Sequence, residues 1–89
     1  MVLNEKILNE ILNYLDSSIS NLAKDTISPE FQMETHDLKQ FLSNQYDIRL
    51  ANLLQGKNSN VHHLESGMKN KIIQRKETLL KDIVNQGQN

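Results

Sequence analysis

Three histidines are the residues of this chain best suited to chemistry, because imidazole binds metals and transfers protons near neutral pH. They are His36, His62 and His63. His62 and His63 are adjacent, so on a helix their side chains point about 100° apart and cannot both face one ion as an i, i+4 pair does. Glu65 adds only an i, i+3 pair with His62, and the chain has no cysteine, HExxH or Glu-x-x-His pattern. We therefore expect no metal and no cofactor.

Catalysis has no support in the pattern of side chains. The serines do not stand in a G-x-S-x-G nucleophile elbow. The chain has 3 glycines, all isolated, so no glycine-rich loop is present to hold a phosphate. A chain of 89 residues with 4% aromatic content also leaves little room for a closed pocket. The expectation is a protein that is not an enzyme.

Basic residues gather in the last third of the chain. Residues 57–89 hold six basic and three acidic side chains, whereas residues 1–56 hold four basic and eight acidic ones. Lys69 and Lys76 share one helical face, and Lys71 and Arg75 share another. Such side chains attract phosphates, so a small nucleic-acid-binding regulator using these four residues is the alternative function. We favour it less, because the row is split across both flanks of an apolar stripe and no aromatic residue is interleaved for base stacking.

Arg75 and Lys76 have a second interpretation. They lie at the two edges of the apolar stripe of the last helix, where charges set the register of a helix against its neighbours. Glu5, Glu10 and Asp16 on the first segment are the natural complements. We take Arg75 and Lys76 as candidate partner-binding residues.

A thin apolar line on the first segment supplies the other candidates. Leu3, Ile7 and Tyr14 recur along one flank of that segment, beside its main apolar stripe. A helix that packed against a single neighbour would not need this line, so it predicts a second contact with a partner protein. Three apolar residues off the main stripes are expected to be exposed and to extend the patch: Met33, Ile48 and Leu54.

Helical periodicity supplies the elements that carry these residues. Apolar residues recur at helical spacing and predict helices over residues 4–24, 29–55 and 60–84, followed by a tail at 85–89. The fold class is therefore all-α, a small antiparallel bundle of three, or possibly four, helices. No run of about 20 apolar residues and no secretory signal is visible, so we expect a cytoplasmic protein.

Turn-forming residues mark the boundaries of the helices. Asn4 and Asn60 are expected N-caps, and Ser28-Pro29 is a strong helix start. Gly56 suits the end of the middle helix, because glycine tolerates a left-handed cap. The stripe of the middle segment rotates by roughly 80° near Ser43-Asn44, so that helix is either bent or broken there. A further glycine inside the last helix, Gly67, is either tolerated drift or a point of close approach by another helix.

Size and composition complete the prediction. An 89-residue chain forms one domain, residues 1–89, and buries only about 60–65% of its unfolded surface. Without cysteines it has no disulfide to supplement this core, so a homodimer that merges two cores is the preferred state. No segment carries the motif of a known family. The sequence therefore predicts a non-catalytic protein–protein interaction module, a small bacterial or phage regulator, inhibitor or assembly factor that binds a protein partner through a helix face.

Overall fold

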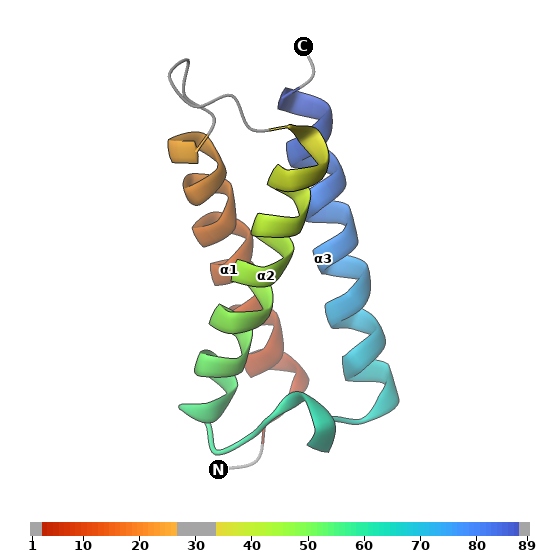
Figure 1. Cartoon of the computed structure of the whole chain (residues 1–89). Coiled ribbons are helices and arrows are strands. Elements are labelled where there is room, and N and C mark those ends of the chain that lie inside the picture. The colour runs from red at the N-terminus through yellow and green to blue at the C-terminus, as the bar shows by residue number, and fades with distance from the viewer. Residues whose placement is uncertain (1–2, 27–33, 88–89) are drawn as a thin grey trace.

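A computed structural model of the chain describes residues 3–26 and 34–87, without the side chains of residues 35, 61, 86 and 87. It consists of three α-helices, α1 (Glu5–Thr26), α2 (Thr35–Gln55) and α3 (Ser66–Gly87), and a short 3-10 turn, η1 (Val61–His63). The helices run up, down and up, and each contacts the other two (Figure 1). The described residues contain no strand. The predicted all-α bundle is confirmed with three helices, and the four-helix alternative is wrong.

The first helix forms where the sequence predicts it. The Oδ1 atom of Asn4 accepts a hydrogen bond of 2.9 Å from the backbone N–H of Ile7, which is the expected N-cap. At the other end, the hydroxyl of Thr26 donates to the carbonyl of Leu22 at 2.8 Å. The main stripe of α1 faces the core through six buried residues: Leu8, Ile11, Leu12, Leu15, Ile19 and Ala23.

The middle helix is continuous through Ser43 and Asn44, so the predicted alternative of a broken helix is wrong. Its buried residues follow one another at every fourth position: Leu38, Leu42, Tyr46, Leu50 and Leu54. At 100° per residue, each step of four rotates the buried line by about 40° around the helix. A row of this kind forms a ridge that slants across the helix axis. The rotation of the apolar stripe that is seen in the sequence therefore corresponds to a slanted contact line on one unbroken helix.

The start of α2 differs from the prediction, whereas its predicted end at residue 55 is confirmed. Glu34 is an extended N-cap residue with φ −62° and ψ 149°, so α2 begins at Thr35 and not at residue 29. The expected start at Ser28-Pro29 lies outside the described residues. Gly56 does end α2, but with a right-handed φ of −62°. The left-handed residue of this turn is Asn58, with φ 57°, because asparagine also tolerates that conformation.

The last helix begins six residues later than predicted. Asn60 caps only η1, where its Oδ1 atom accepts a hydrogen bond of 3.1 Å from the backbone N–H of His63. A start at Ser66 places the poor helix former Gly67 in the first turn rather than in a helix interior. Among the described residues, no neighbouring element comes close to Gly67: an added Cβ would meet none of their atoms within 4 Å. The close-approach interpretation is wrong, and α3 extends to Gly87 instead of ending at residue 84.

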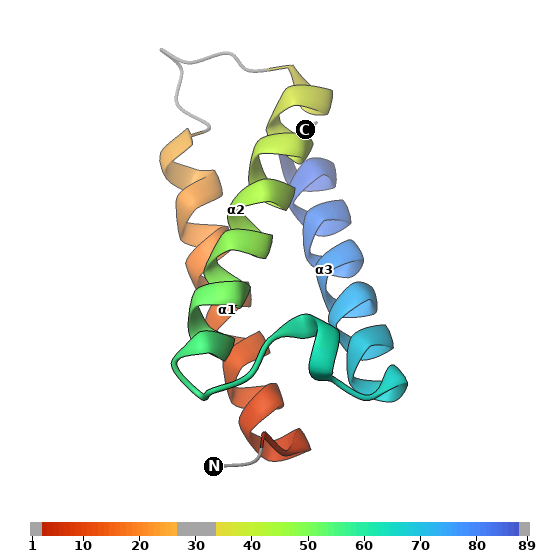
Figure 2. The same cartoon turned by 60° about the horizontal axis from the view of Figure 1, so that its bottom comes forward.

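A single hydrophobic core fills the space between the three helices. Tyr46 is its largest fully buried side chain, and Leu80 of α3 also belongs to it. The connection from α2 to α3 crosses one end of the bundle, beside the start of α1 (Figure 2). Leu64 in this connection is buried and closes that end of the core. No helix in the described part of the chain has both the length and the apolar content that crossing a membrane would require.

Candidate functional site

Arg75 and Lys76 connect α3 to opposite neighbours. One guanidinium nitrogen of Arg75, Nη2, donates to Oδ2 of Asp16 at 2.5 Å and to Oδ1 of Asn13 at 2.9 Å, both on α1. The Nζ atom of Lys76 donates to Oδ1 of Asp47 on α2 at 2.8 Å. The interpretation of these two residues as edge charges is confirmed. Both candidate partner-binding residues are therefore engaged within the molecule.

The complements of these charges were predicted in part. Asp16 is one of the three expected carboxylates, whereas Glu5 and Glu10 are exposed and make no ion pair among the described residues. Asp47 was missed. It directly follows the buried Tyr46, so it stands at the edge of the slanted line of α2 and could have been found there.

The basic row of the nucleic-acid alternative is divided by the fold. Arg75 faces α1 and Lys76 faces α2, and each is held by a carboxylate. Lys69 and Lys71 are half-buried. Phosphate binding is strongest when unpaired basic side chains form one continuous track. Each of them then neutralises a phosphate and releases the counterions that the nucleic acid had bound there. The four residues do not form such a track.

The three residues of the apolar line on α1 differ in how far they are buried. Leu3 and Ile7 are half-buried and pack against the core, whereas 59% of Tyr14 is exposed. The three residues therefore do not form one continuous exposed line: Leu3 and Ile7 belong to the start of α1, beside the α2–α3 connection (Figure 2), and Tyr14 stands alone on the surface. Of the extending residues, Ile48 is 53% exposed, as expected, but Leu54 is fully buried. Met33 lies outside the described residues.

Tyr14 borders a shallow groove between α1 and α2, which we call the α1–α2 groove. Its volume is about 340 Å³, and its lining comprises Tyr14, Ser17, Ser18, Asn21, Leu22, Asp25 and Arg49. Arg49 connects the two helices, since its Nη1 atom donates to the hydroxyl of Ser18. Ile48 lies between Asp47, which faces α3, and Arg49, which faces α1. It therefore points outward, about 100° from each, and lies next to the groove residue Arg49 without lining the groove itself.

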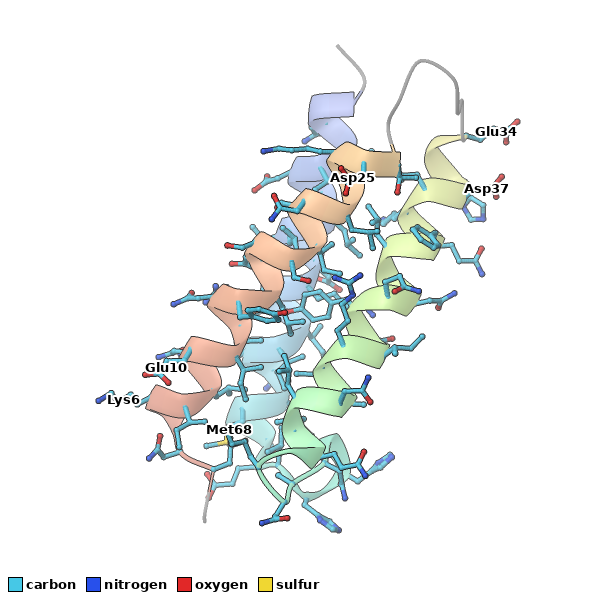
Figure 3. All side chains as sticks on the ribbon, turned by 90° about the vertical axis from the view of Figure 1, so that its left-hand side faces the viewer. Lys6, Glu10, Asp25, Glu34, Asp37 and Met68 are labelled. Atoms are coloured by element: carbon cyan, nitrogen blue, oxygen red, sulfur yellow. The ribbon has the colours of Figure 1, made fainter. Side chains whose placement is uncertain are left out.

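This groove is almost free of charge along its middle. Between Glu10 and Lys24 the only charged residue of α1 is Asp16, which pairs with α3. On α2, between Lys39 and the end of the helix, the charged residues are Asp47, which also pairs with α3, and Arg49. Figure 3 looks onto this side of the bundle and shows charged side chains toward the two ends of the helices: Lys6, Glu10, Asp25, Glu34 and Asp37.

The lining of the groove combines one aromatic residue, Tyr14, with one arginine, Arg49, and one carboxylate, Asp25. Interfaces between proteins are enriched in aromatic residues and arginine, and depleted of lysine, glutamate and aspartate, relative to the rest of the surface. Ser17 and Asn21 add polar side chains that can form hydrogen bonds. Arg49 could have been suspected from the sequence, because on a straight helix it falls within the apolar face.

Two polar atoms beneath the ion pairs have no hydrogen-bond partner among the described residues: the hydroxyl of Tyr46 and Oδ1 of Asp16. Burial raises the pKa of Tyr46 to about 12; nearby Asp16 and Asp47 add to the increase, and Arg75 opposes it. The Nζ atom of Lys76 lies 6.0 Å from the centroid of the Tyr46 ring. The phenol thus stays neutral at physiological pH, in the core and away from the groove.

The histidines do not converge. His36, His62 and His63 are exposed, and Nδ1 of His63 lies 3.2 Å from the side-chain nitrogen of Asn60. Within the described part of the chain, no three His, Cys, Asp or Glu residues are grouped so that they could hold a metal ion. Comparisons with known protein families, curated proteins and solved structures find no match to this chain.

Proposed function

We propose that this protein is a non-catalytic protein–protein interaction module, a small regulator, inhibitor or assembly factor that binds its partner through the α1–α2 face. By this face we mean the α1–α2 groove together with Ile48. The observation that carries the proposal is the exposure of Tyr14 and Ile48, 59% and 53%, on a surface whose middle has Arg49 as its only charge. Burying both side chains against a partner is favourable, and little charge has to be desolvated on this side of the contact.

The dimensions of the bundle suit this role. The bundle measures 44 × 21 × 19 Å, so one long side offers roughly 800 Å². A stable interface between proteins buries about 800 Å² on each partner. One side of this small bundle is therefore large enough for a specific complex, whereas the shallow groove alone would enclose little of a small molecule.

A second copy of the chain is one partner that this face suits. In a two-fold symmetric dimer the same patch lies on both sides, so a charge close to the axis meets its own copy. In the middle of the α1–α2 face only Arg49 is subject to this repulsion, and a dimer would enlarge a core that is marginal at 89 residues. A cytoplasmic setting is consistent with the absence of cysteine.

A photo-crosslinking experiment tests the proposal. Benzoylphenylalanine replaces Tyr14 or Ile48 in cells of the source organism, and replaces the exposed Gln74 of α3 in a matched control. We expect a discrete adduct after irradiation from positions 14 and 48 and not from position 74. An adduct near twice 10.3 kDa identifies a second copy, and any other discrete mass identifies another protein. If positions 14 and 48 give no adduct beyond that of the control, the α1–α2 face is not a binding surface.

A further inference from the structure

A second groove, which we call the α2–α3 groove, lies between the first half of α2 and the second half of α3. Its volume is about 580 Å³. Its apolar floor comes from α3: Ile73 is 52% exposed, Val84 is half-buried, and Leu80 is buried between them. These residues are spaced i, i+7 and i+11, so they form one stripe over about three helical turns. The floor is long enough to contact the apolar side of another helix.

Lysines stand on both sides of this floor. Lys39 of α2 and Lys81 of α3 line the groove, and both side chains are exposed. Neither makes an ion pair with another described residue. Lys76 also lines the groove but is bound to Asp47, and the acidic residue of the lining is Glu77. Two ammonium groups without a carboxylate partner therefore flank an exposed apolar stripe.

We propose that the α2–α3 groove binds an acidic amphipathic helix of a protein partner. Its apolar side packs on Ile73 and Val84, and its carboxylates pair with Lys39 on one side and Lys81 on the other. This is the helix-in-groove mode of recognition, in which an apolar stripe supplies affinity and flanking charges fix orientation. The site is separate from the α1–α2 face, so the inference stands or falls independently of the proposed function.

Two other occupants fit less well. A nucleic acid would use the lysines but would leave Ile73 and Val84 without a role, and the lining contains no aromatic residue for base stacking. The described residues of a second copy offer no free acidic amphipathic helix, because the apolar stripes of α1, α2 and α3 are already buried in its core. A partner helix with carboxylates beside an apolar stripe satisfies both features of the groove.

Titration of the ¹⁵N-labelled protein with a designed peptide tests this inference. The probe is a 16-residue helical peptide with leucines on one face and glutamates on both flanks, and the control peptide has lysine at every glutamate position. We expect amide shifts at Ile73, Val84 and Lys39 with the acidic peptide, and at least tenfold weaker binding of the basic peptide. Absence of shifts at the groove, or equal binding of both peptides, overturns the proposal.

Variants of the protein separate the contribution of the lysines to peptide binding from that of the apolar floor. The double substitution Lys39→Glu and Lys81→Glu should weaken the acidic peptide at least tenfold and strengthen the basic one. Ile73→Asp should weaken both peptides, whereas Tyr14→Glu on the other face should change neither. Circular dichroism verifies that each variant is folded. Binding of a 20-base-pair DNA duplex that needs the lysines but is unaffected by Ile73→Asp would assign the groove to nucleic acid and refute a helix as its occupant.

Discussion

Tyr46→Phe should stabilise this protein, although it removes a polar group from the largest fully buried side chain. Tyr46 is 0% exposed, and its hydroxyl has no partner among the described residues. Leaving such a group buried without a hydrogen bond costs about 1–3 kcal/mol of desolvation. Phenylalanine keeps the ring and its packing while removing this penalty. We expect the free energy of unfolding to rise by about 1 kcal/mol, the lower end of that range.

Urea denaturation measures the effect directly. For a small domain with an m-value of about 1 kcal/mol/M, the increase moves the unfolding midpoint by about 1 M. Tyr14→Phe is the matched control, because it removes an exposed phenol and should change stability by less than about 0.5 kcal/mol. A loss of stability greater than that in Tyr46→Phe would refute the reasoning, since it would show that the hydroxyl has a stabilising partner.

The same substitution should also remove a pH dependence. The pKa of Tyr46 is about 12 in the folded protein, against 10.0 for an ordinary tyrosine. Between these values the folded state keeps a proton that the unfolded state releases, so the free energy of unfolding falls as pH rises. Two pKa units correspond to a loss on the order of 2–3 kcal/mol by pH 12. The advantage of Tyr46→Phe over the wild-type chain should therefore grow above pH 10, and parallel stability curves would contradict this.

Three further changes test the packing. Gly67→Ala should raise the free energy of unfolding by about 0.5–1 kcal/mol, because the added methyl meets no atom and the unfolded chain loses freedom; a decrease would reveal a contact. Arg75→Met should lower the free energy of unfolding by about 1 kcal/mol and Lys76→Met by less, because Arg75 makes two hydrogen bonds and Lys76 makes one. A larger loss in Lys76→Met than in Arg75→Met, measured by urea denaturation, would contradict this ranking. Ile7→Asp should lower the melting temperature, whereas Tyr14→Asp should leave it nearly unchanged, and equal effects would place both residues in one environment.

Local patterns in the sequence predict the helices well where the apolar stripe keeps one direction. The stripe of α1 and the Asn4 cap are enough to place that helix within two residues of its ends. In α2 the buried line slants, so a straight-helix interpretation assigns Arg49 to the apolar face and suggests a break near Ser43 that does not occur. The angle at which one helix crosses its neighbours is a property of the assembled bundle. No local pattern contains it.

The candidate site was predicted less completely for the same reason. Of the candidate partner-binding residues on one flank of α1, Tyr14 is exposed, whereas Ile7 packs against the core. The difference in exposure between Tyr14 and Ile7 depends on where the α2–α3 connection crosses the bundle. Arg49 was not among the predicted site residues, and its hydrogen bond to Ser18 depends on how α1 and α2 align. Sequence periodicity gives the direction of a side chain around its helix, and the neighbouring helix decides whether that direction is solvent.

Charge explains why two different surfaces coexist on one small bundle. The sequence divides into an acidic part and a basic part, which would suggest two opposite patches. In the fold, Asp16 and Asp47 instead turn toward α3 and pair with Arg75 and Lys76. Because the carboxylates of the middle turns of α1 and α2 form these ion pairs, the α1–α2 face is nearly neutral. Of the remaining cations of α3, Lys81 is exposed and borders an apolar stripe. A neutral surface suits a closely packed partner or a second copy, whereas a lysine-flanked stripe suits an acidic helix.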